Sequence, residues 1–364
     1  SLLIALSKIA SFNIHDRFHR PHIPDAALRA GIGIGVRAAL DRDDAGIADL
    51  AQRVHMAAEI GIIGTGAMGC LFGGYLSRRA DVTLLTHRKQ QAQAIEETGL
   101  SIQTDEGPVA CGTLRAVCAA EVSEVFDLLV VFVKAFQTRD AIEGIRGCIG
   151  PETVILTLQN GIGNGQTLQQ LFRPEQILVG TSTINSQRLS DTAVSQHGGM
   201  GITTIGSLCG KTALAEQTAA FFTSCGFCAE ASTNIDGLIW KKAFINLTIN
   251  PLTALFDRPI GMVEQCEEAW ALGRQEIAEA VQVANASGQS FSYEEVCDFV
   301  WQVLHGAREG TTSMRTDIRA GRPTEIAYLN GAVAALGKQY GIPTPYNTMM
   351  TQLIRTLEFT SRRS

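Results

Sequence analysis

Three glycines, Gly64, Gly66 and Gly69, lie between a short apolar run and a segment with helical character. In a Gly-x-Gly-x-x-Gly turn, the first glycine permits the tight turn and the second lets a pyrophosphate approach the backbone. The third lets the helix pack closely on the strand, and the helix N-terminus attracts phosphate. Glycine turns are common, but a strand before and a helix after this one predict a dinucleotide-binding turn. Its residues are Gly64, Thr65, Gly66, Ala67, Met68 and Gly69.

Short runs of Val, Ile and Leu alternate with helical segments through the first part of the chain. Continuous apolar runs of this kind are typical of parallel strands that are covered on both faces. The pattern therefore predicts an α/β fold with a Rossmann-type, doubly wound sheet. The expected strands are 60–63, 82–85, 128–133, 154–158 and 177–179, with two or three more around Ser101, Val194 and Ile202.

The strand pattern stops at about residue 231, and the remaining segments are predicted helices. We expect helices at 240–255, 262–286, 293–306 and 325–338. The second domain is therefore predicted to be all-α, with Ser232, Thr233 or Asn234 capping its first helix. No Pro- and Gly-rich linker separates the halves, so we expect a cleft with a hinge between a domain at 57–231 and one at 232–364.

Residues 1–56 lack the strand pattern of the rest and carry mixed charges. We assign them to an N-terminal extension outside the native fold and expect Met56 to be the natural start. Six aspartates in this segment argue against a transit peptide, because such peptides are poor in acidic residues.

Charge, apolar content and cysteine usage favour a small-molecule function in the cytoplasm. The net charge is −6 and no basic stripe is visible, which argues against nucleic acid. The apolar runs are too short to span a bilayer. Nine scattered cysteines indicate reduced thiols, and the Cys225 and Cys228 pair is interpreted as structural, with no metal site. The composition leaves monomer and homodimer open.

Lys242, Asn246 and Asn250 recur at every fourth position of an otherwise apolar helical segment. They would form one narrow polar stripe on a buried helix. Burying an ammonium or a carboxamide without partners costs several kcal/mol. A bound small molecule is one candidate partner. The alternative is that Lys242 reaches the surface while both asparagines bond to neighbouring helices.

The residues after the predicted strands indicate how a cofactor would bind. Where NAD enzymes carry an acidic residue for the ribose, this chain has Arg88, flanked by Lys89 and His87. Because a guanidinium pairs well with phosphate, NADPH is the predicted cofactor. Alternatively, Arg88 is a solvated residue at a helix start. Lys134 and Asn160 follow two further strands and are expected to line the cleft, although a solvated lysine and an Asn-Gly turn are ordinary features.

Further downstream, residues 311–317 precede 321–331, a segment with Pro323 near a predicted helix start and Glu325 in its first turn. Together with Lys134, Gln159-Asn160-Gly and the 240–254 segment, this set resembles the ketopantoate reductase family. The resemblance implies NADPH-dependent reduction of 2-dehydropantoate to pantoate, a step of pantothenate and coenzyme A synthesis. It also implies a cleft between a Rossmann domain and a helical domain.

The resemblance assigns roles to individual residues by matching motif. Lys242 matches the catalytic acid, and Asn246, Asn250 and Ser313 match substrate-binding positions. Glu325 matches a catalytic residue that contacts ligand near the cofactor, and Lys134 and Asn160 match cofactor-side positions. Two departures from the pattern are Ile260, where relatives often have Asn, and Gly310, where some relatives have Asn.

The chemistry of these residues agrees with the resemblance. Hydride transfer to a ketone leaves charge on oxygen, which a protonated Lys242 would stabilise and then protonate. Ser313 and nearby amides would hold the substrate carboxylate, and the two asparagines would orient polar groups beside the ketone. Glu325 would bind a substrate hydroxyl or keep Lys242 charged.

Two alternatives remain open at this stage. The first is a reductase of another bulky 2-oxo acid, because both departures lie near the expected pocket. The second is a non-catalytic NADPH-sensing protein, which would have no use for Lys242 and Glu325.

Overall fold

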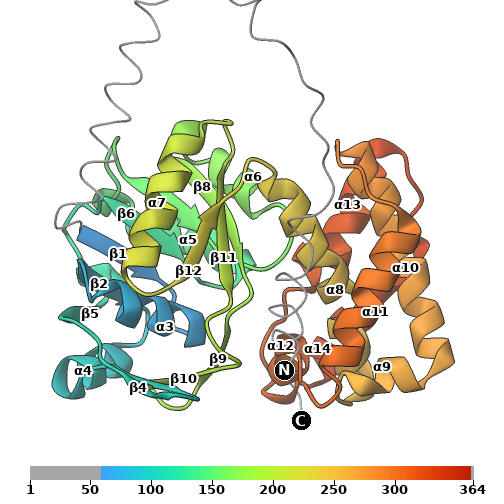
Figure 1. Cartoon of the computed structure of the whole chain (residues 1–364), viewed down its shortest axis with the longest axis horizontal. Coiled ribbons are helices and arrows are strands. Elements are labelled where there is room, and N and C mark those ends of the chain that lie inside the picture. The colour runs from blue at the N-terminus through green and yellow to red at the C-terminus, as the bar shows by residue number, and fades with distance from the viewer. Residues whose placement is uncertain (1–58, 362–364) are drawn as a thin grey trace, which may run out of the picture.

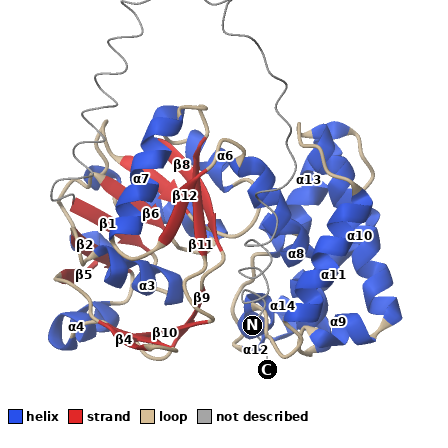
Figure 2. Ribbon diagram, viewed as in Figure 1, coloured by secondary structure: helices blue, strands red, loops and turns tan. Residues whose placement is uncertain are grey.

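The computed structural model describes residues 59–361. The predicted extension at 1–56 lies outside these described residues. A sheet-bearing half and a helical half lie side by side (Figures 1 and 2). The predicted fold class, a Rossmann-type sheet followed by helices, is confirmed. The exact domain boundary at 231/232 stays a proposal.

The main sheet has eight strands in the order β12-β11-β8-β7-β6-β1-β2-β5. All neighbouring strands are parallel except β8 and β11, which are antiparallel. The bounds are β1 (Glu59–Ile63), β2 (Asp81–Thr86), β5 (Leu114–Cys118), β6 (Leu128–Val131), β7 (Val154–Thr157), β8 (Ile177–Ser182), β11 (Ile202–Ser207) and β12 (Cys228–Ala231).

Both faces of this sheet are buried, as the continuous apolar runs predicted. In β6, Leu128 and Val130 belong to one hydrophobic cluster, whereas Leu129 and Val131 belong to another. Successive side chains of a strand point to opposite faces, so each face needs its own apolar cover. The helices that follow these strands are α3 (Ala67–Leu76), α4 (Lys89–Thr98), α5 (Thr138–Glu143), α6 (Asn164–Gln169) and α7 (Thr212–Ser224).

Four short strands form a separate sheet in the order β4-β3-β10-β9. The sequence correctly indicated strands near Ser101 and Val194 but did not separate them from the main sheet. In β3 only Ile102 is buried, which is typical of a strand with one solvated face. The bounds are β3 (Ser101–Thr104), β4 (Gly107–Val109), β9 (Asn185–Arg188) and β10 (Ala193–His197).

The helical half contains seven α-helices among the described residues. Its helices are α8 (Ile235–Phe256), α9 (Gly261–Gln265), α10 (Glu267–Ala286), α11 (Tyr293–Gly306), α12 (Ser313–Arg319), α13 (Asn330–Tyr340) and α14 (Pro345–Ser361). Short 3₁₀ turns are η1 (Ala119–Glu121), η2 (Ala135–Gln137), η3 (Arg146–Cys148), η4 (Pro174–Gln176) and η5 (Ile326–Tyr328).

Asn234 caps α8, because its side chain accepts a hydrogen bond from the Gly237 amide (3.2 Å). Asn234 was one of the three predicted caps. The helix predicted at 240–255 begins five residues earlier, at Ile235, and two other predicted helices differ more from the structure. The segment at 262–286 is two helices, since the backbone at Cys266 is extended. The segment at 325–338 begins with the turn η5, so Glu325 precedes a 3₁₀ turn rather than lying in the first turn of an α-helix.

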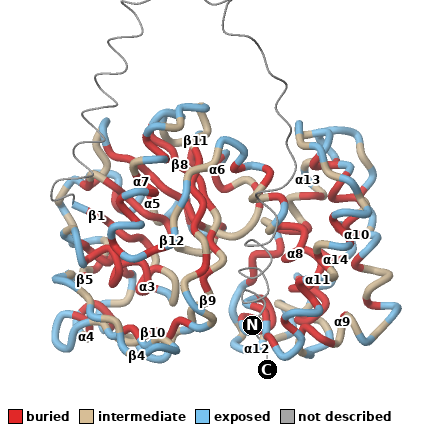
Figure 3. Tube along the Cα trace, viewed as in Figure 1, coloured by how far each residue is buried: buried red, intermediate tan, exposed pale blue. Residues whose placement is uncertain are grey.

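Helix α8 carries the polar stripe and is buried over most of its length (Figure 3). Pro251 lies inside this helix and has no N–H to donate to the Leu247 carbonyl. The side chain of Asn330, which is fully buried, donates to that carbonyl instead (3.0 Å) and also to Asn347 Oδ1 (3.1 Å). An asparagine of α13 therefore repairs the hydrogen-bond pattern of α8.

Asp257 ends α8 in the left-handed conformation, with φ of 52°. Its carboxylate accepts from Arg315 Nε (3.0 Å) and Arg319 Nε (2.6 Å), both in α12. These arginines lower the pKa of Asp257 to about 2. The hydroxyls of Thr253 in α8 and Thr312 before α12 also meet at 2.8 Å. Helix α12 is thus fixed against the end of α8.

Within residues 59–361, no helix is both long enough and apolar enough to cross a membrane. All nine cysteines lie in this range as free thiols, including buried Cys225 and exposed Cys228.

Replacing Asn330 with Ala should lower the free energy of unfolding by about 1–3 kcal/mol, because the Leu247 carbonyl would stay buried without its donor. Urea unfolding followed by circular dichroism measures this loss. Pro251→Ala restores a backbone N–H to the helix, so Asn330→Ala should cost less in that background. Equal losses in both backgrounds would contradict this role for Asn330.

Candidate active site

The glycine turn between β1 and α3 has the geometry that the sequence predicted. Gly64 has φ of +99°, and a Cβ on it would lie 2.5 Å from the Val133 amide nitrogen. A Cβ on Gly69 would lie 1.9 Å from the Gly64 carbonyl oxygen, so the helix packs where only glycine fits. By contrast, a Cβ on exposed Gly66 would have no heavy atom within 4 Å.

The open space at Gly66 is what a bound pyrophosphate requires. Gly66 is the N-cap of α3. Because glycine has no side chain, the cap residue leaves the first amides of the helix uncovered. Thr65 is buried and its hydroxyl donates to Gln91 Oε1 (2.8 Å), which ties the turn to α4. Ala67 and Met68, half-buried, begin α3. These residues fit a dinucleotide, and their contacts to it stay a prediction.

Arg88 lies at the end of β2 and caps α4, as expected for a residue beside the adenosine ribose. Its guanidinium pairs with Asp191 in the β9–β10 turn at 2.5 Å. The neighbouring Lys89 pairs with Glu121 at 2.8 Å, and both of those side chains are largely exposed. The role of Arg88 toward a 2′-phosphate stays a prediction.

Lys134 joins the sheet half to the helical half. It follows β6, and its ammonium lies 2.7 Å from Asp317 in α12 and 3.8 Å from Glu325. Glu325 also accepts a hydrogen bond from the Ala135 amide (3.2 Å). We call Lys134, Asp317 and Glu325 the charged clasp, since all three contacts cross between the halves.

Contacts within the charged clasp shift the pKa values of Lys134 and Glu325. Burial alone would lower the pKa of Lys134, but Glu325 and Asp317 outweigh it and the pKa is raised. Burial raises the pKa of Glu325, although Lys134 and the Ala135 amide oppose this. Asp317 is the nearer partner of Lys134, whereas the charge of Glu325 raises the pKa of Lys134 more strongly. Asp317 also accepts from Arg322 Nε (3.1 Å).

Lys242 extends from α8 toward the sheet, not into bulk water. Its ammonium donates to the Ser182 carbonyl at the end of β8 (2.7 Å). Burial lowers the pKa of Lys242 to about 8, and the negative charge of Glu325 acts against this lowering. A lysine in this state can both stabilise an anion and release a proton near neutral pH.

Asn246 and Asn250 lie one and two turns further along α8, and both are buried. The Asn250 Oδ1 atom is buried without a hydrogen-bond partner. The stripe predicted from four-residue spacing therefore lies on α8 beside Lys242, and the roles of both asparagines stay predictions.

Ser313 is exposed and is the first residue of α12. Thr312, the residue before it, caps the helix by accepting from the Arg315 amide (3.2 Å). The predicted contact of Ser313 with a substrate carboxylate is untested. Its placement follows from the fixation of α12 against α8.

Asn160 is half-buried in the loop after β7, and that loop is held on both sides. Gln159 Nε2 donates to the Val133 carbonyl (2.6 Å), which joins the loops after β6 and β7. Ile162 N donates to the Tyr328 carbonyl (2.8 Å) in the helical half. Lys134 and Asn160 are therefore brought to one edge of the sheet, next to the joint.

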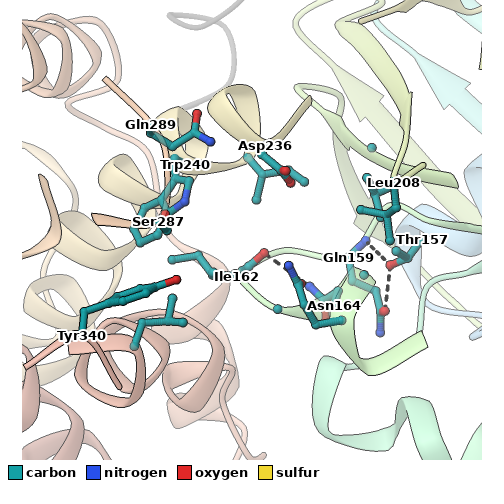
Figure 4. Close-up of a pocket in the computed structure, with 18 residues that line it drawn as sticks. Thr157, Gln159, Ile162, Asn164, Leu208, Asp236, Trp240, Ser287, Gln289 and Tyr340 are labelled. Atoms are coloured by element: carbon teal, nitrogen blue, oxygen red, sulfur yellow. Dashed lines mark hydrogen bonds between the residues drawn. The ribbon is translucent and has the colours of Figure 1, made fainter. Parts of the chain in front are cut away.

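A separate groove lies at the joint near α6 and the first turns of α8. Figure 4 shows side chains of both halves facing it, including Asn164, Asp236 and Trp240. Its lining contains no lysine or arginine and includes neither Lys242 nor Glu325. An anionic substrate needs positive charge, so the charged clasp and Lys242, not this groove, form the candidate active site.

Sequence reasoning gave no role to Asp317, the Ser182 carbonyl or Asp191. Asp317 is the last residue of the 311–317 motif. An acidic residue next to apolar positions was the feature that could have indicated its role. A backbone carbonyl such as that of Ser182 leaves no signal in the sequence.

Both halves match descriptions of one protein family. The family description "Ketopantoate reductase PanE/ApbA" matches residues 60–210, and "Ketopantoate reductase PanE/ApbA C terminal" matches residues 234–358. A 2-dehydropantoate 2-reductase of Streptococcus pyogenes serotype M3 is 32% identical over 300 residues, covering 82% of this chain and 97% of the relative. The chain belongs to the ketopantoate reductase family. This confirms the resemblance found in the sequence.

Another relative and two solved structures are also similar to this chain. A 2-dehydropantoate 2-reductase of Halobacterium salinarum is 32% identical, covering 80% of this chain and 96% of that relative. The 2-dehydropantoate 2-reductase structure from Geobacter metallireducens is 30% identical, with a TM-score of 0.76, covering 82% of this chain and 99% of that one. A ternary structure of D-mandelate dehydrogenase with NADH and anilino(oxo)acetate is 29% identical, with a TM-score of 0.79, covering 83% and 99%.

The two departures from the family pattern are neighbours in the structure. The Ile260 amide donates to the Gly310 carbonyl (3.0 Å), although fifty positions separate them in the sequence. Ile260 is fully buried in the core of the helical half.

Glu325→Gln should lower the pKa of Lys242 further, because it removes the negative charge that opposes desolvation. If protonated Lys242 is the active form, the alkaline limb of the kcat/KM profile should move to lower pH by about one unit. Glu325→Asp keeps the charge and should leave the limb near its wild-type position. An alkaline limb that Glu325→Gln does not move would exclude this coupling.

Proposed function

We propose that this chain reduces 2-dehydropantoate to pantoate with NADPH, acting as a 2-dehydropantoate 2-reductase. The observation that carries the proposal is the position of Lys242. Its buried ammonium donates to a carbonyl at the edge of the sheet, and the negative charge of Glu325 raises its pKa. Membership of the family and the names of relatives from Streptococcus pyogenes and Halobacterium salinarum support the substrate. Structures of D-mandelate dehydrogenase with NADH support a nicotinamide dinucleotide as cofactor.

Lys242 acts as the general acid. The bound nicotinamide would supply hydride to the carbonyl carbon of the substrate. Negative charge then develops on the carbonyl oxygen, and the Lys242 ammonium stabilises it more strongly than it does a neutral ketone. The lysine gives one proton to this oxygen, so the product is the 2-hydroxy acid and Lys242 is left neutral until it takes a proton from solvent.

The charge of the site suits one carboxylate. Lys134, Lys242 and Arg322 carry three positive charges, and Asp317 and Glu325 carry two negative ones, leaving one net positive charge when Glu325 is ionised. A 2-oxo acid brings one negative charge. In this proposal Ser313 at the start of α12 holds the carboxylate, and Asn246 and Asn250 on α8 orient the polar groups beside the ketone.

The cofactor would lie along the carboxyl edge of the sheet. The glycine turn receives the pyrophosphate at Gly66, and Arg88 pairs with the 2′-phosphate of NADPH. Lys134 and Asn160 lie at the ends of the next strands, where open α/β sheets bind ligands. Glu325 contacts the ligand near the cofactor and also keeps Lys242 protonated.

A second candidate is reduction of another bulky 2-oxo acid. The similarity to D-mandelate dehydrogenase favours it, and the two positions where the sequence was expected to depart from the family pattern, Ile260 and Gly310, lie next to each other. Both candidates use the same lysine. They differ in whether the pocket recognises the hydroxyl of 2-dehydropantoate.

Lys242→Ala should lose about 10²- to 10⁴-fold in turnover of 2-dehydropantoate, the usual contribution of a general acid. Binding of NADPH should be retained, because Lys242 is assigned to the reacting oxygen. The measurement is NADPH consumption followed by absorbance, together with NADPH titration by fluorescence.

Lys241 is the matched control, since it is the exposed neighbour of Lys242 on α8. Lys241→Ala should keep normal turnover. A panel of 2-oxo acids, including phenylglyoxylate, is assayed beside 2-dehydropantoate with the wild-type chain. Faster turnover of another acid would favour the second candidate, and NADPH binding without turnover of any acid would indicate a sensing protein.

Arg88→Ala should weaken NADPH binding by about 10- to 100-fold and leave NADH binding unchanged, because the charge-assisted bond to the 2′-phosphate is lost. Fluorescence titration with each cofactor measures the two dissociation constants. The same change for both cofactors would remove Arg88 from the 2′-phosphate site.

A further inference from the structure

Asp191 lies between two arginines at the adenosine end of the predicted cofactor site. One of its carboxylate oxygens is 2.5 Å from Arg88 Nη2, and Arg188 pairs with the same oxygen. Arg88 comes from the end of β2 in the main sheet, whereas Asp191 and Arg188 belong to the small sheet and its turn. The arginine assigned to the 2′-phosphate therefore already has an anionic partner.

The backbone of Asp191 is also held by a hydrogen bond, which distinguishes this contact from an ordinary surface ion pair. Gln91 Nε2 donates to the Asp191 carbonyl (3.2 Å), and Gln91 is buried. The same side chain accepts from the Thr65 hydroxyl (2.8 Å) and donates to the Thr65 carbonyl (3.0 Å). Gln91 thus connects the Asp191 turn to the dinucleotide-binding turn.

We infer that Asp191 is a specificity-determining residue that lowers the preference of this enzyme for NADPH over NADH. The inference rests on the proposed assignment of Arg88 to the 2′ position of the cofactor. A 2′-phosphate and the Asp191 carboxylate are both anions that need the same guanidinium. NADPH must displace this carboxylate or accept its repulsion, whereas the 2′-hydroxyl of NADH is neutral and can donate to it.

The net charge around Arg88 also indicates that Asp191 weakens the binding of NADPH relative to NADH. Arg88 and Arg188 contribute two positive charges and Asp191 one negative charge, so the cluster offers one net positive charge to a phosphate that carries up to two negative charges. Without the aspartate, two positive charges would face the phosphate. Arg88 and Asp191 have 39% and 41% of their side-chain surface exposed, so solvent moderates the effect but does not cancel it.

The test is Asp191→Asn in the full chain, with dissociation constants for NADPH and NADH measured by fluorescence titration. NADPH should bind about fivefold more tightly, the size expected for a half-exposed charge pair, and NADH should bind equally or more weakly. Adenosine 2′,5′-bisphosphate and 5′-AMP serve as probes of the 2′-phosphate alone and should repeat the pattern.

Asp105 provides a matched control on the same small sheet. It pairs with His197 and the Gly198 amide, not with Arg88. Asp105→Asn should change neither dissociation constant. In Arg88→Ala the further change Asp191→Asn should have less effect on NADPH, since the shared guanidinium is absent.

The outcomes separate this inference from the proposed function. If Arg88→Ala weakens NADPH but Asp191→Asn changes nothing, or changes both cofactors equally, the inference is wrong and the proposed function stands. Weaker NADPH binding in Asp191→Asn also overturns it, because Asp191 would then position Arg88 for the phosphate. If Arg88→Ala leaves NADPH binding unchanged, both the assignment of Arg88 and the inference fail.

Discussion

The contact between the Lys242 ammonium and the Ser182 carbonyl is the interaction on which the candidate site depends. A buried ammonium without oxygen partners would cost several kcal/mol. Here the helix supplies the charge, the sheet supplies a carbonyl 2.7 Å away, and Glu325 supplies the opposing charge. Desolvation still outweighs these partners and lowers the pKa to about 8. The pKa of Lys242 therefore depends on how the two halves are placed relative to each other.

The placement of the halves depends on further contacts across the joint. The charged clasp joins the loop after β6 to α12 and to Glu325, and the Ile162 amide bonds to the Tyr328 carbonyl. Because Glu325 belongs to the clasp and also acts on Lys242, the contact that holds the halves together tunes the lysine as well. Helix α12 is in turn fixed by Asp257 at the end of α8.

Positive side chains along the carboxyl edge of the sheet are paired with carboxylates from other elements. Lys134 has Asp317 and Glu325 at one end, and Arg88 has Asp191 at the other. In each case the partner comes from a different element, so the positive side chain is oriented before any ligand binds. Such preorganisation reduces the entropy lost on binding, although an anionic partner also competes with an anionic ligand. The relative size of preorganisation and competition depends on how exposed the carboxylate is. Asp317 is buried, whereas Asp191 is not.

The sequence by itself determined the features that depend on local periodicity. The glycine spacing, the apolar strand runs, a cap at 232–234 and the four-residue polar stripe are all properties of short segments, and the structure contains each of them, with strand bounds that differ by a few residues. The sequence did not predict the separate small sheet, the break at Cys266 or the 3₁₀ turn after Glu325, because packing against distant elements decides these. The tertiary structure alone joined Lys242 to the Ser182 carbonyl, Arg88 to Asp191, and Lys134 to Asp317, pairs separated by 60, 103 and 183 positions. Such contacts follow from the route of the chain through two halves, and residue type alone does not reveal which distant oxygen a buried cation will meet.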